Sequence, residues 1–449
     1  MDDLSQTFIV EAIDLTHDAL GVCRLEDGYT VFVEDMLKGE SAEIIITSRG
    51  KNYGFGKVVH RLSKSPYRIT PKCRHFYECG GCNLMHIEYD LQLSFKRYRI
   101  ETMLRKNHLD HVIVKDMLQM AQPYFYRNKV EIKFRQGPNG VEAGFFQTKS
   151  HVLVNLEECH IIPKKMYDII ALIRNICNEL KIDAYDDERK TGILKSVIIR
   201  ESHTSKEIII LFQLAKALPL VDRLVHKLIS RFPEVSGMAT TLTKDESNLS
   251  PDPITIIYGK DHIIETILQV KYRIGYRSFF QVNSLQAEKL YQRAIEYANL
   301  TGKERAVDCY SGIGSIALAI AGSVSKVFGI EIFKPAVIDA RKNAVLNHIT
   351  NAFFEVGDAA KVLKKWNQYK FDVLFVDPPR RGCSKEFLDV VSAMKIPRIV
   401  YISCDQETLG RDLVLLTQSG YVVREITPVD MFPLTTHVES VTLLSLKTA

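Results

Sequence analysis

The sequence predicts an α/β protein whose C-terminal part is a doubly wound, mostly parallel sheet. From about residue 303 onward, short apolar runs alternate with segments of helical spacing, which is the pattern of β-α-β units. Before residue 65, short β-rich runs separated by glycines indicate a small five-stranded barrel. A region that mixes helices and strands lies between the two. We therefore expect a barrel over 1–65, a central α+β domain over 66–270 and a Rossmann-like domain over 271–449.

The chain of 449 residues is long enough for two or three hydrophobic cores. Its 46% hydrophobic and 25% charged residues are typical of a globular protein and exclude a disordered or collagen-like chain. The first residues lack the pattern of a secretory signal, and no apolar run is long enough to span a membrane. We therefore expect a cytoplasmic monomer with no membrane partner. The net charge of +5 permits RNA as a partner but does not require it.

The predicted barrel contains two runs of strand character, 29–33 and 42–47, and it ends near Ser65 and Pro66. A barrel of this size can hold single-stranded nucleic acid or dock another protein. Because of the basic residues and the motifs that follow it, we favour RNA.

In the central region, the pattern predicts a helix over 169–180, strands over 197–200 and 207–211, and a loop over 244–253. In the C-terminal region it predicts strands over 306–310, 326–330, 352–356, 371–376, 399–402, 421–426 and 438–446, with helices over 316–321 and 335–347. Ligands of such sheets bind at the carboxyl ends of the strands, so motifs at those ends are the candidates for function.

The first of these motifs is a turn with two glycines, Gly312 and Gly314, where the first strand ends and its helix begins. Two glycines alone are a weak signal, and the third glycine of the dinucleotide fingerprint is missing, because position 317 is Ala. Glu331, however, ends the next strand, where a carboxylate can bind both hydroxyls of a ribose. The alternative is a helix-capping acid beside turn glycines. We favour a ribose-bearing cofactor without a pyrophosphate, and S-adenosylmethionine is the candidate.

Asp377-Pro378-Pro379-Arg380 ends the fourth predicted strand and forms a rigid turn at the mouth of the crevice. Methyltransferases that act on exocyclic amines of bases use a similar turn ending in an aromatic residue. Arg380 stands at that position here, which argues against amine chemistry.

Cys404 ends the next strand, directly before a helix that Asp405 opens. A thiol at a helix start is expected to have its thiolate favoured by the helix dipole, which makes Cys404 the candidate nucleophile. The alternative is a buried structural cysteine, and Cys309 and Cys383 are rival thiols in the same crevice.

Glu439 begins the last strand, where a lone glutamate is most often an exposed charge. Together with Cys404 and a methyl donor it has a specific use. The C5 carbon of uracil becomes nucleophilic when a thiolate adds to C6, and after methylation the C5 proton must go to a base. Cys404 and Glu439 are the two groups that this reaction needs.

The chain has nine cysteines, an odd number, and three of them have the spacing Cys73-x5-Cys79-x2-Cys82. In a cytosolic protein such spacing indicates metal ligation rather than disulfides. An iron–sulfur cluster is favoured over zinc, although zinc could use the same thiolates with His86 or His160. We expect Cys23 and Cys177 to be buried and without a role in the site.

These motifs together resemble the RNA uracil-5-methyltransferase family, in particular its branch that acts on 23S ribosomal RNA and carries an N-terminal TRAM barrel and an iron–sulfur cluster. The resemblance covers essentially the whole chain. The family motif that begins at Ser403 carries the nucleophile, which corresponds to Cys404, and the closing His-x-Glu motif carries the base, which corresponds to Glu439. This sequence has Gln406 and Gly410 where proline and alanine are usual, so we expect a looser turn after Cys404.

The resemblance also implies the ligand-binding residues. It implies that S-adenosylmethionine contacts Gln281, Tyr310, Glu331 and Asp377. It places Phe279 near the target base, where an aromatic ring can stack on a flipped nucleotide. It implies a [4Fe-4S] cluster held by Cys73, Cys79, Cys82 and Cys159.

Three alternatives to a 23S uridine remain open: a uridine of tRNA, another RNA base, and RNA binding without catalysis. Cys404 and Glu439 together favour catalysis on uracil. The tRNA branch generally lacks the barrel and the cluster cysteines, which favours ribosomal RNA. RNA cytosine-5 enzymes place a second cysteine directly after the proline, where this chain has arginine.

Overall fold

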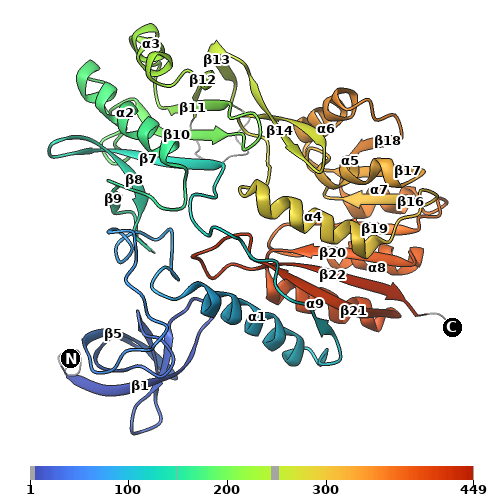
Figure 1. Cartoon of the computed structure of the whole chain (residues 1–449), viewed down its shortest axis with the longest axis horizontal. Helices are drawn as coiled ribbons and strands as arrows, with labels where there is room; N and C mark the ends of the chain where they lie inside the picture. Colours follow the sequence, from blue (N-terminus) through green and yellow to red (C-terminus); the bar gives the residue numbers. More distant parts are fainter. Residues whose placement is uncertain (1–5, 149, 244–251, 448–449) are drawn as a thin grey trace.

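The computed structural model describes residues 6–148, 150–243 and 252–447. It has three parts, an N-terminal barrel, a central sheet with two helices and a large C-terminal sheet with helices on both faces (Figure 1). The predicted loop 244–253 lies mostly outside the described residues. No helix within the described ranges is long and apolar enough to cross a membrane.

The N-terminal part is a closed five-stranded barrel, as the sequence predicts, and its strand order is β1-β2-β3-β5-β4. Its strands are β1 (Thr7–Leu15), β2 (Gly21–Arg24), β3 (Thr30–Glu34), β4 (Ser41–Arg49) and β5 (Tyr53–Arg61). Alternate residues such as Val31, Val33 and Ile44 fill the interior. Gly21 is required at a close approach, because a Cβ there would lie 2.8 Å from the Met36 carbonyl oxygen.

The central sheet has seven strands in the order β13-β12-β11-β10-β7-β8-β9. They are β7 (Lys129–Gly137), β8 (Gly140–Phe146), β9 (Leu153–Asn155), β10 (Leu194–Glu201), β11 (Ile208–Leu214), β12 (Val235–Leu242) and β13 (Ile254–Gly259). Helices α2 (Lys164–Leu180) and α3 (Val221–Arg231) pack on one face through apolar stripes. β10 and β11 are buried on both faces, because the C-terminal part covers the other one.

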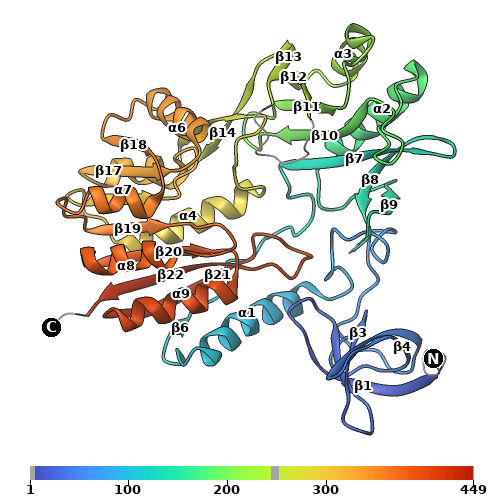
Figure 2. The same cartoon turned by 180° about the vertical axis from the view of Figure 1, so that it is seen from behind.

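Two elements inside the range predicted for the central domain belong to the C-terminal sheet instead. Strand β6 (Ile113–Val114) pairs with β21 (Tyr421–Val429), and helix α1 (Tyr89–Lys106) lies beside α9 (Gln406–Gln418), as Figure 2 shows. The reason is apolar burial, since Ile100 of α1 shares a core with Leu413 of α9. The hairpin of β14 (His262–Ile267) and β15 (Val270–Gly275) likewise packs into the C-terminal core.

The C-terminal sheet has eight strands in the order β18-β17-β16-β19-β20-β22-β21-β6. The first five are parallel, and β22 is antiparallel to both its neighbours. The remaining strands are β16 (Arg305–Cys309), β17 (Lys326–Glu331), β18 (Ala352–Val356), β19 (Val373–Val376), β20 (Arg398–Ser403) and β22 (Glu439–Leu446). The remaining helices are α4 (Ser284–Ala298), α5 (Ser315–Ile320), α6 (Lys334–Leu346), α7 (Ala359–Lys365) and α8 (Lys385–Met394). The doubly wound fold is therefore the one that the sequence predicts.

Candidate active site

One large cavity, of about 1750 Å³, lies at the carboxyl ends of the central parallel strands. It is lined by all six residues predicted to react or to contact the cofactor: Gln281, Tyr310, Glu331, Asp377, Cys404 and Glu439. Phe279 also lines it and is 72% exposed. The fold thus brings together side chains from six separate parts of the sequence, while their individual roles stay predictions.

The glycine turn after β16 requires left-handed backbone, with φ of +55° at Gly312 and +85° at Gly314. The Glu331 carboxylate accepts hydrogen bonds from the backbone N–H groups of Gly312, at 3.1 Å, and Phe333, at 2.8 Å. Each of its oxygens keeps a lone pair that can accept a ribose hydroxyl. Glu331 caps neither α5 nor α6, but it holds the glycine turn in a shape that can cradle a ribose-bearing ligand.

Cys404 lies between β20 and α9 and is half-buried. Asp405 caps α9 by accepting a hydrogen bond from the backbone N–H of Thr408 at 2.9 Å. The side chain of Gln406 is buried and donates to the Val438 carbonyl at 2.7 Å. The Gln406 side chain therefore helps to hold the turn after Cys404. The expectation of a looser turn did not take this hydrogen bond into account.

The pKa of the Cys404 thiol is raised to about 11, chiefly by burial and then by the Glu439 and Asp377 carboxylates, whereas Arg380 lowers it. The expectation that the helix start favours the thiolate is wrong for this structure. The desolvation of the thiol and two neighbouring negative groups outweigh the helix dipole. A raised pKa favours the thiol form of Cys404 over the thiolate.

The rival thiols are placed differently. Cys309 is fully buried, and it is absent from the lining of the cavity. Cys383 touches the cavity, but it is 5% exposed and its sulfur lies 3.6 Å from the Tyr401 hydroxyl. Cys404 is therefore the most accessible thiol of the three.

Glu439 is 4% exposed, so it is not the exposed strand-end charge that a lone glutamate usually is. Burial raises the pKa of its carboxyl well above the ordinary value, and Asp377 raises it further. Its Oε2 atom has no hydrogen-bond partner among the residues that the structure describes. A buried carboxyl with an unused oxygen beside a thiol is a candidate for proton transfer.

Asp377 is another buried acid of the cavity, and burial raises its pKa to about 7. The cavity also contains residues that were not singled out from the sequence, among them Asp358 and Phe432. Asp358 follows β18 and caps α7, so the rule that ligands bind at strand ends could have found it. Phe432 lies in the segment before β22 and no local pattern marks it, whereas His437 of the same segment begins the closing His-x-Glu motif.

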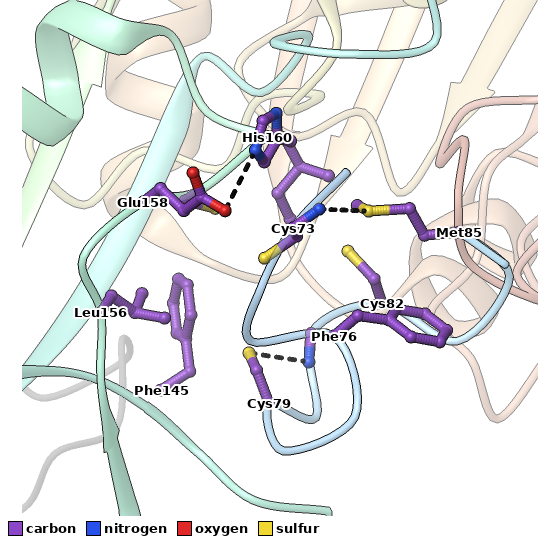
Figure 3. Close-up of a pocket in the computed structure, with 12 residues that line it drawn as sticks. Cys73, Phe76, Cys79, Cys82, Met85, Phe145, Leu156, Glu158 and His160 are labelled. Carbon is purple, nitrogen blue, oxygen red and sulfur yellow. Dashed lines mark hydrogen bonds and ion pairs between the residues drawn. The ribbon is translucent and has the colours of Figure 1, made fainter. Parts of the chain in front are cut away.

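A second, smaller pocket lies between the segment 73–85 and the segment 156–161 (Figure 3). It is lined by the four predicted cluster ligands, Cys73, Cys79, Cys82 and Cys159. Burial raises the pKa of each thiol, and the neighbouring thiols raise it further at Cys82. His160 lines the pocket, and His86 does not appear in its lining. Within the described ranges, no three His, Cys, Asp or Glu side chains are arranged to hold a metal ion, so the metal is not established.

Comparison with known proteins adds sequence and structural relatives. Residues 254–447 match the tRNA (Uracil-5-)-methyltransferase family, and residues 6–59 match the TRAM domain. An uncharacterized RNA methyltransferase of Oceanobacillus iheyensis is 39% identical and covers 97% of this chain and 95% of its own. One of Bacillus cereus is 40% identical, with 96% and 95% covered.

Among solved structures, the tRNA (uracil-54, C5)-methyltransferase of Pyrococcus abyssi, in complex with S-adenosyl-L-homocysteine, superposes with a TM-score of 0.78. It is 28% identical and covers 97% of this chain and 99% of its own. The match to the TRAM domain confirms the barrel, and the C-terminal match confirms a methyltransferase domain of the predicted kind.

Proposed function

We propose that this chain, which belongs to the RNA uracil-5-methyltransferase family, methylates C5 of a uridine in 23S ribosomal RNA. In this proposal Cys404 and Glu439 are the reacting groups. One observation carries the mechanism. A thiol and a buried carboxyl with an unused oxygen line the same cavity as the glycine turn and its ribose acceptor. Neither amine methylation nor RNA binding alone requires this pair.

In the proposed reaction the Cys404 sulfur, once deprotonated, forms a bond to C6 of uracil, and the electron pair of the C5–C6 bond becomes available at C5. S-adenosylmethionine, when bound, supplies the methyl group that C5 takes. Glu439 then removes the proton from C5, the C5–C6 double bond forms again, and Cys404 leaves as a thiolate. The raised pKa of Glu439 suits this step, because an ionised carboxylate of high pKa binds a proton tightly.

The cavity fits the cofactor at several points. Glu331 has lone pairs to accept ribose hydroxyls, and the left-handed glycine turn lets a ligand approach the backbone closely. Gln281, Tyr310 and Asp377 surround the same space. We propose that these four residues hold S-adenosylmethionine.

A uridine of tRNA is the second candidate substrate. The archaeal tRNA enzyme superposes along nearly the whole chain, barrel region included, so the barrel does not separate the two substrate classes. Resemblance of the cysteine motif to the ribosomal branch favours 23S RNA. Another RNA base is disfavoured by Arg380, which stands where amine methyltransferases have an aromatic residue.

The test is to map 5-methyluridine in 23S RNA and in tRNA from cells with and without this gene, and after complementation with Cys404→Ala. The proposal expects a site in 23S RNA that disappears with the gene and returns with wild type but not with the variant. If 5-methyluridine is lost only from tRNA, then the substrate is tRNA and the proposed chemistry stands. If the Cys404→Ala variant restores the methylation, then Cys404 is not the nucleophile.

We also propose that Cys73, Cys79, Cys82 and Cys159 hold a [4Fe-4S] cluster. Four sulfur atoms around one pocket, with apolar neighbours such as Phe76 and Met85, are a donor set that iron–sulfur clusters use. The pocket lies apart from the Cys404 cavity, so we assign the cluster a structural role.

A further inference from the structure

The segment from Ser278 to Ser284 joins β15 to α4 and carries four residues of the cavity, Ser278, Phe279, Gln281 and Val282. It belongs to no helix or strand before α4 begins. A segment without a backbone ladder is positioned by the partners that its carbonyl groups find elsewhere. Figure 1 shows that α4 begins between the central sheet and the C-terminal sheet.

Asn128, directly before β7 of the central sheet, makes three contacts with this segment. Its backbone N–H donates to the Val282 carbonyl at 2.7 Å. Its side-chain Nδ2 donates to the Gln281 carbonyl at 2.9 Å and to the Ser284 hydroxyl at 2.8 Å. Asn128 is 7% exposed, so water does not compete freely for these bonds.

Arg200, near the end of β10, makes the fourth contact. Its Nη2 donates to the Ser278 carbonyl at 2.7 Å, and the residue is 2% exposed. Nε and Nη1 are buried without a hydrogen-bond partner in the part of the chain that the structure describes. Burial lowers the pKa of this guanidinium to about 10.

The pairing of β7 with β10 brings the two residues together. Arg200 lies opposite Lys129 in the strand register, and the Glu201 N–H donates to the Asn128 carbonyl at 2.9 Å. Arg200 has no carboxylate partner among the residues that the structure describes. A buried cation without such a partner is a poor source of stability, because a hydrophobic side chain of the same length has no charge to desolvate. Its contact with Ser278 therefore calls for a role other than stability.

We propose that Asn128 and Arg200 are positioning residues of the methyltransferase site, through which the central domain fixes the backbone of the 278–284 segment and so aims the Gln281 side chain at the cofactor. The inference rests on the proposed function, in which Gln281 contacts S-adenosylmethionine. Neither residue lines the cavity, so both act through the segment that they hold.

The experiment measures binding of S-adenosyl-L-homocysteine by calorimetry, together with the melting temperature, for Asn128→Ala and Arg200→Met. Each variant is expected to weaken binding about three- to tenfold, the loss of one or two hydrogen bonds. Arg200→Met is expected to keep a melting temperature close to wild type, because it removes a buried charge. Arg135→Met, an exposed arginine at the far end of β7, is the matched control and is expected to leave both measurements unchanged.

A double variant separates positioning from general structure. If Asn128 acts through Gln281, then Asn128→Ala combined with Gln281→Ala weakens binding no more than Gln281→Ala alone, whereas independent effects add. Lower melting temperatures with unchanged affinity, or fully additive losses, would overturn the inference. If Gln281→Ala alone leaves the affinity for S-adenosyl-L-homocysteine unchanged, then Gln281 does not contact the cofactor. In that case the proposed function fails at this contact, and the positioning role is left without its premise.

Discussion

At the scale of single residues, Glu439 and Cys404 come close because β20 and β22 are antiparallel partners, with Ser403 opposite Ser440. Cys404 directly follows one strand and Glu439 begins the other, so the pairing of the two strands sets their separation. The negative charge of Glu439 contributes to the raised pKa of Cys404, which shows that the two groups interact. Their chemistry can be tested on the same RNA.

We predict that Glu439→Gln stalls after methyl transfer. Thiolate addition and methylation both precede proton removal, so the variant should accumulate a covalent adduct between Cys404 and methylated RNA. The adduct should survive denaturing electrophoresis and carry label from the methyl donor.

The control is the double variant Cys404→Ala, Glu439→Gln, which should give no labelled band. Normal product release by Glu439→Gln would assign the base elsewhere. Asp377 would be the first candidate, because its pKa of about 7 suits a base near neutral pH.

At the scale of elements, the turn between β20 and α9 is tied to the segment before β22 by the hydrogen bond from Gln406 to the Val438 carbonyl. We predict that Gln406→Leu lowers kcat about threefold to tenfold, as the loss of one buried hydrogen bond would, because the base and the nucleophile are no longer held together. Affinity for S-adenosyl-L-homocysteine should not change. Single-turnover kinetics and calorimetry measure the two effects.

Gln418→Leu, at the exposed end of the same helix, is the matched control for this change and should behave like wild type. If Gln406→Leu loses cofactor affinity and thermal stability together, with kcat per folded molecule retained, then the contact is structural and does not orient the reacting groups.

The cysteine pocket makes a separate prediction. Protein purified without oxygen should be brown and contain iron and sulfide in stoichiometric amounts, and Cys159→Ser should lose the colour. Cys177→Ala, whose thiol is buried in the central core away from the pocket, should keep it. Colourless wild-type protein that contains zinc would contradict the cluster.

At the scale of the whole molecule, the barrel is joined to the next segment by a buried ionic network. Glu40 is fully buried and binds both Arg61, at the end of the barrel, and Arg68, beyond it. His86 packs against this joint, with its ring 5.2 Å from that of Phe76 and its Nε2 atom 3.8 Å from Asp35. The barrel is thereby fixed next to the cysteine pocket.

We expect the connection between the barrel and the next segment, formed by this ionic network and His86, to lose stability in mild acid. Burial lowers the pKa of His86 from 6.5 to about 4, so its contribution to stability is present above pH 6.5 and is lost as the pH falls toward 4. The loss is roughly 3 kcal/mol for a shift of this size. We predict that the free energy of unfolding in urea falls between pH 7.5 and pH 5, and that His86→Phe reduces the fall.

His60→Phe, on the exposed surface of the barrel, is the control and should leave the pH dependence of the wild type in place. An equal fall in wild type and His86→Phe would show that other groups cause the acid sensitivity.

Local patterns predicted much of the C-terminal part. The expected helix over 335–347 is α6 (Lys334–Leu346), and the expected strand over 399–402 lies inside β20. Strand alternation and helix periodicity depend on near neighbours, so a single sequence contains them. Local patterns could not predict that α1 and β6 pack with the C-terminal part, because this depends on which apolar surfaces of distant elements pack against each other.

The sequence by itself determined the barrel, the alternation of strands and helices in the C-terminal part, and the candidate residues at strand ends, because these follow from periodicity and from chemistry at known positions. Only the tertiary structure decided the electrostatics of the site. Burial and two carboxylates raise the pKa of Cys404, although its place before a helix suggested the opposite. Desolvation and charge act through space, among groups that lie far apart in the chain, so no pattern of neighbouring residues contains them.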